Sequence, residues 1–125
     1  MHHTLNPRTH GYLDYLGVLF FFVAPSLFGF DDKVANLSYI IGVAYLGMVL
    51  LTAYPMGVLK WIPFPIHGGV ELALGAFLIA SPWLLRFSQA PTERNVMVVT
   101  GIAILGVWFL TDYRAAGHPR VAHQA

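Results

Sequence analysis

The chain has 125 residues, 57% of them hydrophobic, with 7 Lys or Arg, 6 Asp or Glu and a formal net charge of +1. Charged residues make up 10%, against about 25% in an ordinary soluble domain, which excludes a small soluble fold with its large polar surface. The composition also excludes a disordered chain, and the small net charge gives no basis for binding nucleic acid. The absence of Cys excludes disulfides, thiolate chemistry and iron–sulfur clusters.

Four segments are almost free of charged side chains. A helix that crosses the bilayer needs about 20 mostly apolar residues, and only a helix satisfies its own backbone in lipid. The sequence therefore predicts an all-α membrane protein of four transmembrane helices, with the lipid bilayer as its partner, over 12–30, 35–54, 66–87 and 95–113. The first span could be mistaken for a signal peptide, but Pro25 follows Ala24 where a cleavage site would be needed.

The segments between these spans are short. Spans one and two are joined by Asp31, Asp32 and Lys33, and spans three and four by residues 88–94. The middle connector, 55–65, reads PMGVLKWIPFP, and its three prolines oppose a continuing helix. We expect this connector to lie along the membrane interface, and the polar tail 114–125 to be loose.

The orientation follows from the basic residues. Both termini share a side with the middle connector, and this side carries Arg8, Lys60, Arg114 and Arg120. The other side carries Lys33, Arg86 and Arg94. The positive-inside rule therefore favours cytoplasmic termini in a bacterial inner membrane.

The chain is an internal tandem duplication. With an offset of 57, the first span aligns with the third, and with an offset of 59 the second aligns with the fourth. The matched pairs include His10/His67, Asp14/Glu71, Pro25/Pro82, Asn36/Asn95, Gly42/Gly101, Gly47/Gly106, Thr52/Thr111 and Tyr54/Tyr113. The sequence thus predicts a single membrane domain, 1–125, with two-helix repeats over 10–54 and 66–113. Two spans return the chain to its starting side, so the two hairpins should enter the membrane in parallel.

The second repeat carries a Ser81-Pro82-Trp83 motif within LALGAFLIASPWLLRFS. This motif resembles the signature of the SPW-repeat family of small bacterial membrane proteins, in which a two-helix unit bears Ser-Pro-Trp in its first helix. The first repeat has Ala24-Pro25-Ser26 and keeps only the proline. The resemblance covers about residues 10–113 and implies a membrane location and this fold, but no established reaction or cofactor.

Pro25 and Pro82 should bend their helices, with Trp83 as an anchor at the interface. An alternative is a discontinuous helix whose freed carbonyls bind an ion. The glycine pairs Gly42/Gly47 and Gly101/Gly106 allow close approach to each helix on two sides. They predict packing within the bundle, or a row that faces another protomer.

Two polar pairs occupy equivalent places in the repeats. His10 and Asp14, and likewise His67 and Glu71, are spaced i, i+4 and share a helix face. The helix directions place Thr52, Thr111, Asp112 and two tyrosines at the same level. Carboxylates within a membrane are costly and are candidates for function. The predicted polar cluster is His10, Asp14, His67, Glu71, Tyr54 and Tyr113.

Three functions are compatible with this cluster. The first is a non-enzymatic module that self-associates or supports a larger membrane assembly, with the cluster as a structural network. The second is a small oligomeric protein that translocates protons or ions through the two pairs. The third is a membrane subunit that binds haem or a metal. No nucleophile motif or phosphate loop is present, so we assign neither a catalytic residue nor a cofactor and leave the metal open.

Overall fold

The computed structural model describes residues 5–111, which form four long helices. They are α1 (Pro7–Phe28), α2 (Asp32–Leu51), α3 (Phe64–Leu84) and α4 (Pro91–Leu110). Each has the length and apolar composition to cross a membrane, since about 20 residues at 1.5 Å per residue span roughly 30 Å. The prediction of a four-helix membrane protein is confirmed.

The helices start and end earlier in the chain than the charge pattern predicts. Pro7 and Pro91 stand at the first positions of α1 and α4, and Asp31 caps α2 by accepting from the Val34 N–H at 3.0 Å. Proline and acidic caps are favourable at a helix start, so the polar boundary residues belong to the helices. At the other end, Thr52 and Thr111 already have extended backbone.

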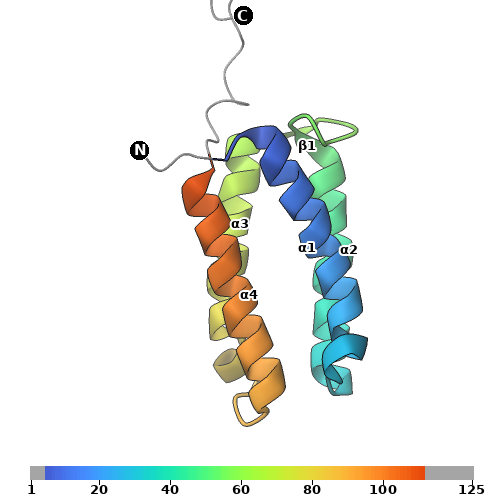
Figure 1. The fold of residues 1–125 in the computed structure, drawn as a ribbon, viewed down its shortest axis with the longest axis vertical. Coiled ribbons are helices and arrows are strands. Elements are labelled where there is room, and N and C mark those ends of the chain that lie inside the picture. The colour runs from blue at the N-terminus through green and yellow to red at the C-terminus, as the bar shows by residue number, and fades with distance from the viewer. Residues whose placement is uncertain (1–4, 112–125) are drawn as a thin grey trace, which may run out of the picture.

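The chain folds into two helical hairpins, α1 with α2 and α3 with α4 (Figure 1). We call them repeat 1 and repeat 2. Helices α1 and α3 both start at the end of the bundle near the described chain ends, here the terminal end, and run to the opposite loop end (Figure 1). The repeats therefore have the predicted parallel orientation. Their equivalence extends to the left-handed residues after α1 and α3, Gly29 (φ 67°) and Arg86 (φ 62°).

Short parallel strand pairings close the terminal end. Strand β1 (Thr52–Ala53) pairs with β2 (Ile62–Pro63), and an equivalent bridge joins Leu5 to Thr111. The end of each repeat is thus held beside the start of the other. The sequence does not predict this pairing, which occupies part of the connector 55–65. Tyr113 and the tail 114–125 lie outside the described residues.

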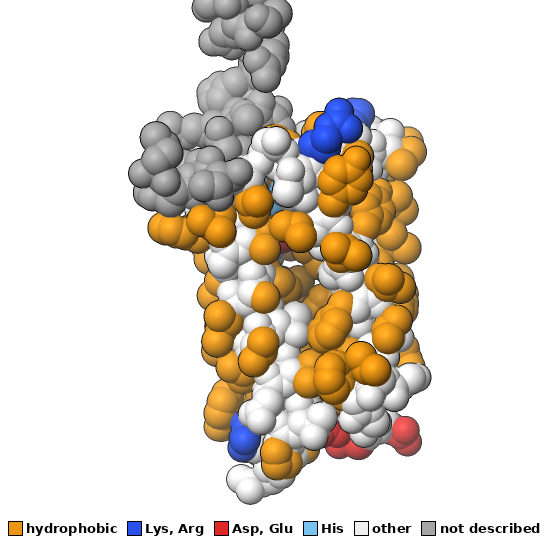
Figure 2. Space-filling view, in the orientation of Figure 1, with side chains coloured by type: hydrophobic (Ala, Val, Ile, Leu, Met, Phe, Trp, Pro, Cys, Tyr) orange, Lys and Arg blue, Asp and Glu red, His pale blue; other side chains and the backbone are white. Residues whose placement is uncertain are grey.

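Hydrophobic side chains cover most of the visible outer surface, and charged groups gather at the two ends (Figure 2). Large apolar side chains such as Leu16, Ile40 and Val99 are exposed, as expected for surfaces that face lipid. Phe21, Val34, Val49 and Leu78 are fully buried and form the core. The fold therefore has the surface of a membrane bundle around a small packed interior.

Helix α1 continues past Pro25, and helix α3 continues past Pro82. A proline leaves the carbonyl four residues earlier without its helical N–H donor. The freed carbonyl of Phe21 accepts from Ser38 Oγ at 2.6 Å, and that of Leu78 accepts from Ser81 Oγ at 2.8 Å. The structure thus has continuous helices at Pro25 and Pro82, and the discontinuous-helix alternative is wrong. It also gives the serine of the Ser-Pro-Trp motif a physical role.

Candidate functional site

Four side chains meet between the repeats, near the terminal end. His10 and Asp14 come from α1, His67 and Glu71 come from α3, and each is at most 1% exposed. We call these four residues the carboxylate–histidine cluster. Both carboxylates lie roughly 10 Å along their helices, within the segments that span the membrane. The structure thus brings together the two i, i+4 pairs that the sequence singles out.

The shortest contacts of the cluster cross from one repeat to the other. His10 Nε2 lies 2.7 Å from Glu71 Oε1, and His67 Nε2 lies 3.0 Å from Asp14 Oδ2. The contacts within each repeat are longer, 3.2 Å from His10 Nε2 to Asp14 Oδ1 and 3.4 Å from His67 Nε2 to Glu71 Oε1. Each histidine therefore faces both carboxylates, and the cluster belongs to neither repeat alone.

Two threonines orient the imidazole rings, and each histidine again contacts the threonine of the other repeat. His10 Nδ1 lies 2.7 Å from Oγ1 of Thr111, and His67 Nδ1 lies 2.7 Å from Oγ1 of Thr52. Each hydroxyl donates its single hydrogen to a carbonyl of the preceding turn, at 2.5 Å for Thr52 and 2.6 Å for Thr111. The threonines must therefore accept from Nδ1–H, which turns both Nε2 atoms toward the carboxylates. The strand pairings position these threonines.

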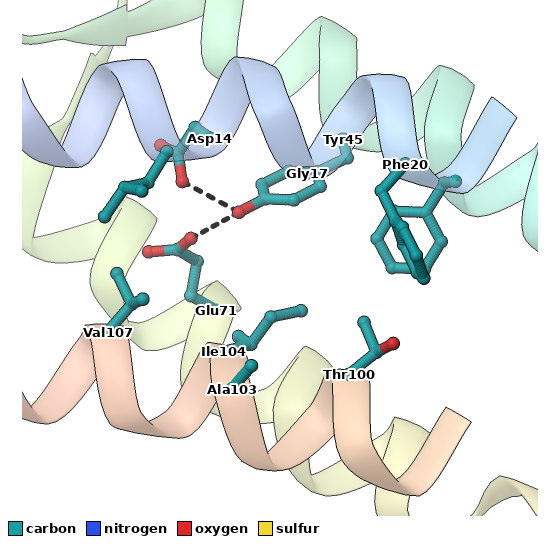
Figure 3. Close-up of a pocket in the computed structure, with 11 residues that line it drawn as sticks. Asp14, Gly17, Phe20, Tyr45, Glu71, Thr100, Ala103, Ile104 and Val107 are labelled. Carbon is teal, nitrogen blue, oxygen red and sulfur yellow. Dashed lines mark hydrogen bonds between the residues drawn. The ribbon is translucent and has the colours of Figure 1, made fainter. Parts of the chain in front are cut away.

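Two tyrosines complete the network. Tyr45 Oη lies 2.8 Å from Asp14 Oδ1 and 2.6 Å from Glu71 Oε2 (Figure 3). Tyr54 donates to Asp14 Oδ2 at 2.9 Å. Burial, reinforced by the negative charge of Asp14, raises the pKa of the Tyr54 hydroxyl above its ordinary value, so Tyr54 stays protonated as a donor. No spacing pattern in the sequence singles out Tyr45, although a tyrosine hydroxyl within an apolar span needs a polar partner.

Phe64 covers the cluster. The centre of its ring lies 5.3 Å from that of His10, 5.6 Å from that of His67 and 5.1 Å from that of Tyr54. These aromatic contacts exclude water from the side of the cluster that they cover. One potential ligand atom from each of the four side chains of the cluster lies within 4.8 Å of all the others, close enough to hold a metal ion.

Charge balance limits what the cluster can hold. Two ionised carboxylates carry two negative charges, and uncompensated charge is costly inside a membrane protein. Two protonated histidines would neutralise them, and so would one divalent cation between neutral histidines. The cluster can therefore hold protons or a cation.

A cavity of about 160 Å³ lies beside the cluster, between the two repeats. Asp14, Glu71 and Tyr45 form its polar wall, and Ile104, Val107 and other side chains of α4 lie opposite (Figure 3). Apart from this wall its lining is mostly apolar. Both carboxylates line this cavity, although each residue is at most 1% exposed.

A second polar contact between the repeats lies at the loop end. Glu93 is buried and accepts from the backbone N–H of Asp31 at 3.0 Å. The Lys33 ammonium donates to the carbonyl of Leu85. In the sequence these charged residues mark only the topology, because nothing in their spacing shows that the two loops meet.

The other candidate residues lie apart from the cluster. Trp83 is 60% exposed near the loop end. A Cβ atom at Gly42 or Gly101 would contact the neighbouring helix of the same repeat, with 3.1 Å to the ring of Phe22 and 2.7 Å to the carbonyl oxygen of Gly75. At Gly47 and Gly106 it would meet no atom of the described residues 5–111 within 4 Å.

Comparison with known proteins gives one match. The family model of the SPW repeat domain matches residues 8–111. No curated protein and no solved structure matches the chain. The matched range includes both repeats and the whole carboxylate–histidine cluster.

Proposed function

This chain belongs to the SPW repeat family of membrane proteins, and from that premise we propose that it is a non-enzymatic module whose buried cluster joins two helical hairpins. The observation that carries the proposal is the exchange of contacts between the repeats. Each histidine has its shortest carboxylate contact with the other repeat, and each accepting threonine comes from the other repeat. The polar chemistry is thus directed inward, toward holding the hairpins together.

The outer faces suit self-association or support of a larger membrane assembly. Gly47 and Gly106 occupy equivalent places on α2 and α4, where a neighbouring helix has room for close approach. Native mass spectrometry of the full chain from a mild detergent tests this part of the proposal. We expect a homo-oligomer or a retained partner, and Gly47→Leu with Gly106→Leu should dissociate it. A wild-type monomer without any partner would contradict the proposal.

The second candidate function is translocation of protons or ions. It is favoured by the cavity between the hairpins, because Asp14 and Glu71 are among the residues that line it. Proteoliposomes with an internal pH dye test it directly. Proton flux in the wild type that is lost in a folded Glu71→Gln variant would show that the protein is a transporter and contradict the non-enzymatic module. Equal flux in protein-containing and empty vesicles supports the module.

We also propose a bacterial inner membrane with cytoplasmic termini. This orientation is supported by Arg8 and Lys60 at the terminal end, together with Arg114 and Arg120 in the sequence. Reporter fusions at the C-terminus test it. A cytoplasmic reporter signal is expected, and a periplasmic signal would reverse the orientation.

A further inference from the structure

We propose that the carboxylate–histidine cluster is a binding site for one divalent transition-metal ion of the zinc type. The ligands are Nε2 of His10 and His67 and one oxygen each of Asp14 and Glu71. One potential ligand atom from each of these residues lies within 4.8 Å of all the others. The site adds a ligand to the module proposed above, and it does not depend on self-association.

The spacing of the ligand atoms is close to that around a small tetrahedral ion. Bonds of about 2.0–2.1 Å to nitrogen and oxygen place neighbouring ligand atoms roughly 3.3–3.4 Å apart. Both histidines face the same oxygen of Glu71, but they face different oxygens of Asp14. Three of the distances are 3.4 Å from His67 Nε2 to Glu71 Oε1, 3.2 Å from His10 Nε2 to Asp14 Oδ1 and 3.0 Å from His67 Nε2 to Asp14 Oδ2, so one Asp14 oxygen has to turn toward the centre of the site when an ion binds. The fourth, from His10 Nε2 to Glu71 Oε1, is 2.7 Å. The Glu71 oxygen and the His10 nitrogen therefore have to move apart by roughly 0.6 Å to reach the tetrahedral spacing.

The surrounding hydrogen bonds are those that a metal site requires. A histidine that binds a metal through one nitrogen commonly donates its other N–H to an oxygen, which fixes the ring. Thr52 and Thr111 accept from Nδ1 in this way, because their own hydrogens are already donated to carbonyls. Tyr45 donates to both carboxylates and Tyr54 donates to Asp14, which restricts their orientation. The two imidazole rings are therefore oriented before any ion arrives, and the two carboxylates need only a small adjustment.

Charge and ligand type define the class of ion. Two carboxylates with two neutral imidazoles carry two negative charges, which one divalent ion neutralises within the membrane. Ca²⁺ and Mg²⁺ favour all-oxygen sites and Cu⁺ favours sulfur, whereas imidazole with carboxylate suits Zn²⁺ and its first-row neighbours. Protonation of both histidines is the competing way to balance the charge, and it becomes an outcome of the test.

The test uses the full chain in mild detergent, purified without a polyhistidine tag, stripped with EDTA and reloaded with Zn²⁺ or Co²⁺. We expect one ion per chain by elemental analysis, and the intense visible bands of tetrahedral Co²⁺. Thr52→Val keeps all four ligands and should weaken Zn²⁺ binding about 10- to 100-fold. Glu93→Gln removes a buried carboxylate far from the cluster and should leave Zn²⁺ binding unchanged.

Two results would overturn the site. A wild-type chain that unfolds cooperatively, yet takes up no stoichiometric Zn²⁺ or Co²⁺ after reloading, holds protons only. Equal metal uptake by a folded His10→Gln, His67→Gln variant would assign the ion to His2, His3, His118 or His123, the remaining histidines of the sequence. If that double variant does not fold, the wild-type stoichiometry and the Thr52→Val affinity still decide the matter.

Discussion

The two repeats are alike at the positions that build the cluster and differ at the positions around it. Tyr45 of α2 aligns with Ile104 of α4, so only repeat 1 supplies a hydroxyl between the two carboxylates. Ile104 instead lines the cavity on the opposite side (Figure 3). The residues that match between the repeats therefore form the carboxylate–histidine cluster. The residues that differ place a tyrosine on one side of the cluster and the cavity on the other.

The repeats also solve one backbone problem in two ways. In repeat 2, Ser81 satisfies the carbonyl that Pro82 frees within the same helix. In repeat 1, Ala24 replaces that serine, and Ser38 of α2 supplies the hydroxyl from the neighbouring helix. Both repeats have the proline, but the serine that bonds to the freed carbonyl lies on the neighbouring helix in repeat 1 and on the same helix in repeat 2.

Substitutions in the carboxylate–histidine cluster, where the two repeats match, should have the largest effect on stability. We expect Asp14→Asn and Glu71→Gln each to lower the free energy of unfolding by about 3–5 kcal/mol, because either change leaves buried partners unbalanced. Thermal unfolding in detergent measures this loss. Glu93→Gln is the control, because it removes a buried carboxylate that lies outside the cluster. Similar losses in the two variants support equivalent roles for the repeats. An unchanged transition in both would show that the cluster does not hold the fold together.

Tyr45→Phe tests the clearest difference between the repeats. It removes a hydroxyl that contacts two carboxylates, and we expect a loss of about 1.5–3 kcal/mol, the usual contribution of a hydrogen bond to a charged group. Adding Ile104→Tyr places a hydroxyl at the equivalent site, beside the cavity, and should recover part of that loss. A double variant that is no more stable than Tyr45→Phe would mean that the repeats are not interchangeable here.

The close contact of α3 and α4 provides the next test. A Cβ at Gly101 would lie 2.7 Å from the carbonyl oxygen of Gly75, whereas at Gly106 no atom in the described part of the chain would lie within 4 Å of it. Gly101→Ala should therefore cost about 1–3 kcal/mol through overpacking. Gly106→Ala in the same helix should be neutral, or stabilising by up to about 1 kcal/mol. Equal unfolding temperatures for the two variants would contradict the packing described for repeat 2.

The serine substitutions should have the smallest effects, about 1 kcal/mol each, as is usual for such hydrogen bonds in membranes. Ser38→Ala also removes a link between α1 and α2, whereas Ser81→Ala affects only its own helix. We therefore expect Ser38→Ala to be the more destabilising in thermal unfolding. If Ser81→Ala were the more destabilising, the link between α1 and α2 through Ser38 would contribute less to stability than the hydrogen bond within α3.

Much of this architecture follows from the sequence. Charge-free segments predict the four spans, and the duplication predicts parallel hairpins that bring His10 and Asp14 toward His67 and Glu71. The helix ends are misplaced because charge gaps mark the apolar centre of a helix rather than its polar caps. The role of Tyr45 and the crossed pairing of Thr52 and Thr111 depend on the register between repeats, which no local pattern encodes.

The central claim is that the cluster couples one repeat to the other. Two double-mutant cycles test it most directly, one pairing His10→Gln with Glu71→Gln across the repeats, and one pairing His10→Gln with Asp14→Asn within repeat 1. The contacts of 2.7 Å and 3.2 Å predict a coupling energy of about 1–3 kcal/mol across the repeats, and a smaller value within repeat 1. Coupling confined to the pair within repeat 1, with none between His10 and Glu71, would contradict the account.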